Sequence, residues 1–191
     1  MTAGVVLLAG GSASRFGSDK RLRVLADGRT LLMAALDSIR RAELPLLVCL
    51  GAADHDLELT LRHEGIHCTR CPDSRQGMGA TLANGIGAVA QSWDGVLVGL
   101  ADMPSIRPDT YLRIRDQLRA NRIVIPTHGG KRGHPVGFDR GFFPELLALE
   151  GDRGARGVLS AHPEAVLEIA VDDPGILLDV DVVADLQSLP A

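Results

Sequence analysis

The fold is indicated by an apolar run, Val5-Val6-Leu7-Leu8-Ala9, that leads directly into a glycine-rich stretch, Gly10-Gly11-Ser12-Ala13-Ser14-Arg15-Phe16-Gly17-Ser18-Asp19-Lys20. The apolar run is typical of a strand buried in a parallel sheet. A strand that runs into a glycine-rich turn is how α/β proteins bring bare backbone N–H groups against phosphate. Arg15 and Lys20 add positive charge to this turn. We therefore expect a polyphosphate-binding loop after the first strand of an α/β protein.

This loop differs from the two common nucleotide-binding motifs. It lacks the Gly-Lys-Ser/Thr ending of a P-loop, and the glycines at positions 10, 11 and 17 do not have the dinucleotide spacing. Four basic residues lie in or just behind it, against a formal net charge of −4 for the whole chain: Arg15, Lys20, Arg21 and Arg23. This clustering favours an anion site over an ordinary solvated face.

Strand-like and helix-like patterns alternate along the chain. Apolar runs predict strands at residues 5–9, 46–50, 66–70, 95–101 and 122–127. Apolar residues at helical spacing predict a helix capped by Thr30, helices at 54–64 and 77–91, and a helix with Pro108 in its first turn. Repeated strand–helix units imply an α/β protein, a single three-layer α/β/α domain over residues 1–191 with a mostly parallel sheet.

The pattern changes at residue 128. Residues 128–133 are predicted to form a loop and residues 135–138 a short strand, with two short helices after them. We interpret residues 128–165 as an insertion or lid carried on the sheet, without a separate domain.

Composition narrows the classes of function. Of the 191 residues, 46% are hydrophobic and 23% are charged, as in an ordinary soluble globular protein. No apolar run approaches the roughly 20 residues that span a bilayer, and no secretion signal is visible. The net charge of −4 argues against a general nucleic-acid binder. We therefore expect a cytoplasmic protein that binds neither membrane nor nucleic acid.

Two cysteines have a spacing that zinc sites allow. Cys68 and Cys71 follow His63 and His67, so a metal site is one interpretation. However, residues three apart in a strand point to opposite faces, which favours ordinary buried thiols. With three cysteines and no export signal, disulfides are not expected.

Two acidic segments are candidates for a metal site. Asp102 directly follows the strand at 95–101, at the end of the sheet where ligands bind in open parallel sheets. Mg²⁺ prefers one or two carboxylates together with phosphate oxygens. A turn or cap role for Asp102 is the alternative. Near the end of the chain, Asp179 and Asp181 would share one face of a strand, and one of them could complete a magnesium site.

Two further segments are candidates for ligand contacts. The stretch from Gln76 to Thr81, Gln76-Gly77-Met78-Gly79-Ala80-Thr81, leads from a loop into a helix, where small residues suit close approach of a base or ribose. Arg132 and His134 form a basic turn before a short strand, which suits an acceptor's phosphate or carbonyl.

Together these segments resemble the nucleotidyltransferases that attach a nucleotide to molybdopterin. The signature loop at 8–20 is similar to theirs, as are four later motifs: Gly77-Met78-Gly79-Ala80-Thr81-Leu82, Asp102-Met103-Pro104, Gly133-His134-Pro135-Val136 and Gly151-Asp152-Arg153-Gly154-Ala155-Arg156. The last two resemble the molybdenum cofactor cytidylyltransferase branch. Ala9-Gly10-Gly11, where that branch has Ala-Ala-Gly, is closer to the guanylyltransferase branch, so CTP and GTP both remain possible donors.

The resemblance implies a fold, a reaction and a set of site residues. The fold is the Rossmann-like nucleotidyltransferase (GT-A type) fold, and the reaction is Mg²⁺-dependent transfer of a nucleotide from an NTP to a molybdopterin phosphate with release of pyrophosphate. Arg15, Lys20 and Asp102 would be catalytic, Asp102 and Asp181 would hold the metal, and Arg132 and His134 would contact the acceptor. The nucleotide would be bound by Leu8, Ala9, Gly10, Gly11, Ser12, Ser14, Arg15, Gly17, Lys20, Gln76, Gly77, Met78, Gly79 and Thr81.

Two alternatives stay open at this point. The acceptor could be a sugar phosphate or another small phosphate. The protein could instead bind nucleotide without catalysis, as an adaptor that serves a molybdoenzyme or its chaperone. The family's closing Asp-x-Asp-Thr-Pro-Glu element leaves room for the adaptor, because here it continues as Val182-Val183-Ala184 after Asp181.

Overall fold

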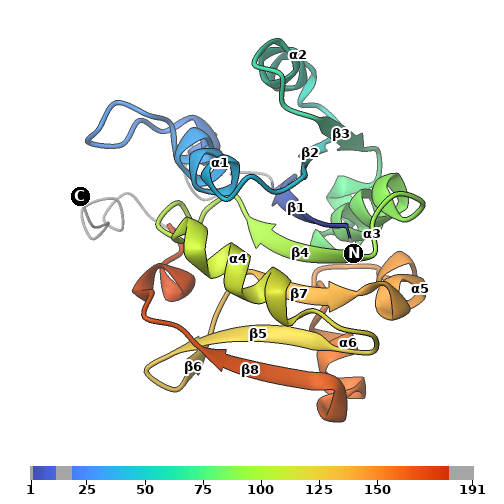
Figure 1. Ribbon diagram of the computed structural model, residues 1–191. Coiled ribbons are helices and arrows are strands. Elements are labelled where there is room, and N and C mark those ends of the chain that lie inside the picture. The colour runs from blue at the N-terminus through green and yellow to red at the C-terminus, as the bar shows by residue number, and fades with distance from the viewer. Residues whose placement is uncertain (1, 12–18, 181–191) are drawn as a thin grey trace.

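The computed structural model describes residues 2–11 and 19–180, which form an eight-stranded sheet with helices on both faces (Figure 1). The strands are β1 (Ala3–Ala9), β2 (Leu46–Gly51), β3 (Cys68–Cys71), β4 (Gly95–Leu100), β5 (Ile123–His128), β6 (Lys131–Arg132), β7 (Val136–Asp139) and β8 (Val166–Ala170). The α-helices are α1 (Leu31–Arg41), α2 (His55–His63), α3 (Met78–Val89), α4 (Pro108–Gln117), α5 (Phe143–Leu147) and α6 (Arg156–Ala161). Short 3₁₀ helices are η1 (Lys20–Leu22), η2 (Ser74–Gln76), η3 (Arg140–Phe142), η4 (Pro163–Ala165) and η5 (Pro174–Leu177).

The sheet is mostly parallel. Strands β3, β2, β1 and β4 lie side by side in that order and are parallel, and β5 pairs in parallel with β8. Strand β7 lies between β4 and β5 and is antiparallel to both. Figure 1 shows this succession from β3 at the top to β8 at the bottom. The predicted α/β class and mostly parallel sheet are confirmed.

The core follows from the side-chain alternation of the central strands. In β1, Val5 and Leu7 pack into one buried cluster, and Val6 and Leu8 into another on the opposite face. Residues of α1, α2 and α4 complete the first cluster, and residues of α3, α5 and α6 complete the second. In Figure 1, α4 lies in front of the sheet. The chain therefore has the three layers that the sequence predicts.

Local signals place two of the helices well. The hydroxyl oxygen of Thr30 accepts a hydrogen bond from Met33 N at 3.2 Å, so Thr30 is the N-cap of α1 as predicted. Pro108 is the first residue of α4, where its missing N–H costs no hydrogen bond.

The predicted loop at 128–133 is wrong in part, because Lys131 and Arg132 form β6. They pair antiparallel with His128 and Thr127, which makes a hairpin with the two-residue loop Gly129-Gly130. Both glycines have φ in the left-handed region, +56° and +76°. The favoured two-residue hairpin turn needs positive φ at both central positions, which Gly-Gly supplies without strain.

The predicted strand around Asp179 is also wrong. Residues 178–180 are outside any strand and lie against the end of β4, where Val180 N donates to the Asp102 carbonyl at 2.9 Å. Within residues 19–180 the last strand of the sheet is β8, which the sequence does not predict. Its side chains are half-buried or exposed, so it lacks the continuous apolar run of the inner strands.

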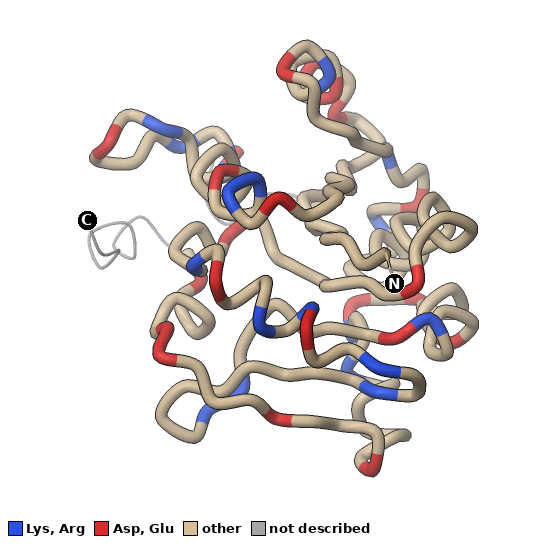
Figure 2. The backbone as a smooth tube through the Cα atoms, viewed as in Figure 1, with Lys and Arg blue, Asp and Glu red and all other residues tan. Residues whose placement is uncertain are grey.

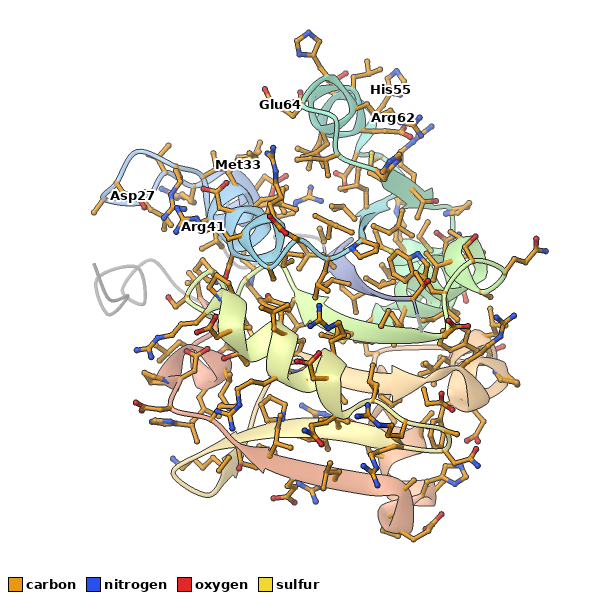
Figure 3. All side chains as sticks on the ribbon, viewed as in Figure 1. Asp27, Met33, Arg41, His55, Arg62 and Glu64 are labelled. Carbon is orange, nitrogen blue, oxygen red and sulfur yellow. The ribbon has the colours of Figure 1, made fainter. Side chains whose placement is uncertain are left out.

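The surface carries both signs of charge. Lys and Arg alternate with Asp and Glu along the tube in Figure 2, in keeping with the small net charge. Helix α2 extends from the sheet at the top of Figure 3, where His55, Arg62 and Glu64 are exposed. In the described part of the chain, no helix has the length and apolarity that crossing a membrane requires.

Cys68 and Cys71 lie on opposite sides of the sheet. The Cys68 thiol donates to the carbonyl of Glu58 on α2, and the Cys71 thiol to that of Ala80 on α3. All three cysteines are free and buried. Strand geometry therefore separates the two thiols, as the residue spacing predicts.

Candidate active site

A cavity of about 420 Å³ opens where β1 and β4 end. Parallel sheets bind ligands at this edge, beyond the carboxyl ends of their strands. We call it the first cavity. It is lined by Leu8, Ala9, Gly10, Gly11, Lys20, Arg21, Leu31, Ser74, Arg75, Gly77, Met78, Thr81, Leu100, Ala101, Asp102 and Asp152.

Lys20 and Asp102 meet in the first cavity. The Lys20 Nζ donates to Asp102 Oδ2 at 2.9 Å and to the carbonyl of Val180 at 3.1 Å. Their side chains are 23% and 25% exposed, so the pair is partly shielded but open to the cavity. Partial shielding strengthens attraction between opposite charges relative to open solvent. The structure thus joins two residues that lie 82 positions apart in the chain.

Arg21, which directly follows Lys20, has one of the most highly bonded side chains of the site. Its guanidinium donates to both carboxylate oxygens of Asp19, at 2.8 and 2.6 Å. It also donates to both oxygens of Asp54, at 2.5 and 2.7 Å, and to the carbonyl of Ala9 at 2.5 Å. Asp54 in turn accepts from Gly51 N at the end of β2. Arg21 therefore ties the segment before Lys20 to the ends of β1 and β2.

The protonation of this cluster follows from the same contacts. Burial disfavours the charge on Arg21, but the hydrogen bonds that its guanidinium donates to Asp54 and Asp19 outweigh this effect and raise the pKa of Arg21. The hydrogen bond from Arg21 likewise lowers the pKa of Asp19, against the effect of burial. Both shifts favour the charged forms of Arg21 and Asp19, so these two groups stay ionised at neutral pH.

The start of α3 is locked to a loop that follows α5. Gly79 N donates to the Gly151 carbonyl at 2.7 Å. Gly77 has φ of +120°, and a Cβ built on it would lie 2.6 Å from the Gly151 carbonyl carbon. A side chain at position 77 would therefore collide with backbone. The two motifs at 77–82 and 151–156 are in direct contact, and they line the first cavity together.

Gly10 and Gln76 differ in their relation to the first cavity. A Cβ on Gly10 would lie 3.0 Å from Thr81 Cγ2, so β1 and α3 approach closely there. Gln76 is not among the residues that line the cavity, and its side-chain amide donates to Asp73 Oδ1 at 3.1 Å. The other described members of the predicted nucleotide set line the first cavity, except for Gly79, which makes the backbone contact to Gly151.

A second cavity of about 280 Å³ adjoins the first. Leu8, Met78 and Leu100 line both cavities, so the two share one wall. Its remaining lining residues are Leu82, Val98, Ile125, Arg132, Gly133, His134, Val136, Phe138, Arg153, Gly154, Ala155, Arg156 and Leu159. Most of its surface is apolar, and its charged side chains within the described residues are arginines.

Arg132 and His134, predicted to contact an acceptor, both line this second cavity. The Arg132 guanidinium is paired with Glu168, with Nε at 2.8 Å and Nη2 at 2.6 Å from Oε1. The Nδ1 of His134 is buried and has no hydrogen-bond partner among the described residues. Burial lowers the pKa of His134, and the charge of Arg156 acts in the same direction. His134 is therefore a neutral group at physiological pH.

Several predicted site residues lie outside the described part of the chain: Ser12, Ser14, Arg15, Gly17 and Asp181. In the described residues, no group of three or more His, Cys, Asp or Glu side chains converges on a point suited to a metal. Among the described residues, the acidic side chains that line the first cavity are Asp102 and Asp152.

The structure adds residues that the sequence did not assign to the site individually, although Arg21 belongs to the basic cluster that predicted an anion site. Arg21 and Asp54 organise the first cavity, Arg75 and Asp152 line it, and the remaining two, Arg153 and Arg156, line the second cavity. Arg153 and Arg156 could have been assigned to the site from the sequence, because both belong to the motif at 151–156. Asp54 lies 33 positions from Arg21, and no local sequence pattern predicts that the two residues pair.

Comparison with known proteins identifies the family. Residues 5–166 match the family described as MobA-like NTP transferase domain. The chain belongs to this family. The purine catabolism protein PucB of Bacillus subtilis is a relative of this nucleotidyltransferase, with 30% identity over 190 residues that cover 92% of this chain and 90% of PucB.

Solved structures agree with this assignment. Rv0371c of Mycobacterium tuberculosis has a TM-score of 0.86 and 31% identity to this MobA-like chain, over 98% of it and 96% of Rv0371c. A second structure of Rv0371c, a complex with manganese, has a TM-score of 0.79. A nucleotidyl transferase from Methanothermobacter shares the fold, with a TM-score of 0.84 at 20% identity over 98% of this chain and 95% of its own. The predicted Rossmann-like nucleotidyltransferase fold is confirmed.

Proposed function

We propose that this protein transfers CMP or GMP from CTP or GTP to the phosphate of a molybdopterin-type acceptor and releases pyrophosphate, in a Mg²⁺-dependent reaction. The observation that carries this proposal is the pair of adjoining cavities, which meet at Leu8, Met78 and Leu100. One cavity has a lysine and a carboxylate at the ends of parallel strands, and the other has an arginine-bearing apolar wall. Phosphoryl transfer depends mainly on positioning the two substrates and neutralising their charge. Adjoining cavities that each bind one anionic substrate would supply both.

In the proposed reaction, an acceptor phosphate oxygen attacks the α-phosphorus of the NTP in line with the leaving group. A new P–O bond joins the two phosphates, and the bond from the α-phosphorus to the bridging oxygen breaks, so that the electron pair leaves with pyrophosphate. Lys20 would stabilise the charge that builds on the α-phosphate. Arg15 and the backbone of residues 10–17 would hold the leaving pyrophosphate.

The Lys20 ammonium now contacts Asp102 and Val180, so it must change partners when a triphosphate enters. Arg21 would not contact substrate. It would keep residues 19–21 in place while Lys20 exchanges its partners, because its five hydrogen bonds are all to protein.

Asp102, with Asp181 as the second carboxylate, would hold Mg²⁺. The donor set fits, since Asp102 lines the first cavity and Mg²⁺ binds one or two carboxylates together with phosphate oxygens. When bound, the metal supplies charge neutralisation on the triphosphate. We further propose that residues 128–165 form the acceptor side of a single domain.

The test uses the purified protein with Mg²⁺, each of the four NTPs in turn and molybdenum-loaded molybdopterin, with pyrophosphate release as the readout. We expect release with CTP or GTP that depends on both metal and acceptor, and none from Lys20→Ala. Release with sugar phosphates but not with molybdopterin would contradict the acceptor. Binding of NTP without release, whatever the acceptor, would point to the adaptor role instead.

A further inference from the structure

The second cavity contains positive charge that the protein does not neutralise. Within residues 2–11 and 19–180, the side chains of Arg153 and Arg156 make no hydrogen bond or ion pair, and both are exposed. Arg132, on the other side of the cavity, is already paired with Glu168. No acidic side chain belongs to the described lining of this cavity. The free positive charge of the cavity is therefore concentrated at Arg153 and Arg156.

These two arginines come from one short turn. Arg156 N donates to the carbonyl of Arg153 at 3.3 Å, which closes the turn at the start of α6. Two guanidinium groups from one turn can present several N–H donors to a single anion, and arginine binds phosphate with paired hydrogen bonds.

The turn is also fixed relative to the first cavity. It follows the loop at 150–152, which is bonded to the start of α3 through Gly79 N and the Gly151 carbonyl. A Cβ on Gly154 would lie 3.0 Å from Met78 Sδ, and Met78 lines both cavities. An anion held by the arginines would thus sit at a set distance from a nucleotide in the first cavity.

The rest of the second cavity is apolar. Leu82, Val98, Ile125, Val136 and Phe138 form most of its wall. A ligand that suits this cavity has an uncharged body, such as a ring system, and one strongly anionic group. Free phosphate or an extended sugar would leave the apolar wall without a partner.

We propose that Arg153 and Arg156 form the subsite for the phosphate monoester of the acceptor, and that the apolar wall holds the acceptor's ring. This inference deepens the proposed function and rests on it for the identity of the acceptor. It reassigns the main phosphate contact from Arg132 to Arg153 and Arg156. Arg132 is a positioning residue here, since its guanidinium joins β6 to β8 through Glu168.

The test measures binding of inorganic phosphate by ³¹P NMR, with the first cavity saturated by Mg²⁺ and the α,β-methylene analogue of the NTP. We expect Arg153→Ala/Arg156→Ala to weaken phosphate binding at least tenfold, and each single change to weaken it severalfold. Arg132→Ala should weaken it less than either single change. Arg140→Ala, which removes an exposed positive charge on η3, is the matched control and should stay within twofold of the parent protein.

Four outcomes would overturn the proposal. One is phosphate binding by the double variant that equals that of the parent protein. A second is a larger loss from Arg132→Ala than from Arg156→Ala. A third is a parent protein that binds no phosphate once the first cavity is filled. The last is a double variant whose affinity for NTP falls as much as its affinity for phosphate. That result would mean that the two arginines bind the nucleotide.

A second measurement separates this proposal from the proposed function. Pyrophosphate release is assayed with molybdopterin, and Arg156→Ala is expected to raise the acceptor KM at least tenfold while the NTP KM changes less than twofold. If molybdopterin is not an acceptor, release fails for the parent protein as well, whereas the phosphate-binding result stands on its own. Circular dichroism and unchanged NTP affinity verify that each variant is folded.

Discussion

The two cavities differ in how their charges are satisfied. In the first, Lys20 is bound to Asp102, and Arg21 is held by two carboxylates. In the second, Arg153 and Arg156 have no partner in the described chain. The Lys20–Asp102 pair and the Arg21 cluster of the first cavity are therefore formed within the protein, whereas Arg75 and Asp152, which also line it, make no hydrogen bond or ion pair within the described residues. In our proposal the second cavity would obtain its counter-charge from the ligand, so substitutions in the two cavities should fail in different ways.

The largest effect is expected from Asp102→Ala. Loss of the carboxylate removes both the partner of Lys20 and the proposed metal ligand, so pyrophosphate release should fall by about 10³-fold and lose its Mg²⁺ dependence. Turnover against Mg²⁺ concentration is the measurement. Asp116→Ala, an exposed aspartate on α4, is the matched control and should behave as the parent protein. Normal metal dependence of Asp102→Ala would show that the first cavity is not the metal site.

Arg21→Met tests whether the first cavity is organised in advance. The change leaves Asp19 and Asp54 without their cation, and we expect a loss of about 3 kcal/mol in the free energy of unfolding. Urea denaturation measures it. Arg21→Lys keeps the charge but not the forked geometry and should recover part of the loss. A loss under about 1 kcal/mol would mean that the cluster is dispensable.

Gly10→Ala tests the close approach of β1 and α3. The new methyl group would lie 3.0 Å from Thr81 Cγ2, so the start of α3 must shift by a few tenths of an ångström. We expect the NTP KM to rise about threefold, an effect of under 1 kcal/mol. Thr81→Ser removes Cγ2 but keeps Oγ1, which would lie 3.1 Å from the new methyl group, so the double variant should recover part of the KM. A KM that Thr81→Ser leaves unchanged would place the effect of Gly10→Ala elsewhere.

The smallest effect concerns pH and the second cavity. The pKa of His134 is lowered in the folded protein, so the unfolded chain binds the proton more readily. Stability should therefore fall as pH drops below about 6.5, the ordinary histidine pKa. Unfolding free energies at pH 7.5 and 5.5 check this, with His134→Asn as the comparison. An equal loss in parent and variant would exclude His134 as the cause.

The sequence predicts most helices and strands of this protein well, because short apolar patterns and capping residues determine them. The continuous apolar run of β1 and the Thr30 cap of α1 are readable in short windows. The hairpin at Gly129-Gly130 is also predictable in principle, since Gly-Gly is a recognised two-residue turn, although the glycine-rich pattern of residues 128–133 predicts a loop. Strand β8 was missed because an edge strand with a charged Glu168 lacks a buried pattern.

The site was predictable where strand ends decide it. Asp102 follows β4 closely and β4 neighbours β1, so topology predicts that Asp102 reaches the first cavity. Lys20 lies eleven residues beyond Ala9, the end of β1, so topology predicts the region in which the two residues meet but not the contact itself. Two contacts of the site could not be predicted from the sequence, because they depend on how two loops pack. These are the pairing of Arg21 with Asp54 and the close approach of Gly77 to Gly151. The pairing of Arg132 with Glu168 could not be predicted either, because Glu168 belongs to β8, whose sequence lacks a buried apolar pattern.

Strand β7 has a consequence for the width of the second cavity. As the antiparallel strand inserted between β4 and β5, it holds these two parallel strands apart by two strand spacings, about 10 Å. Val98 and Leu100 of β4 and Ile125 of β5 line the second cavity, so β7 acts as a spacer that sets how far apart these residues lie.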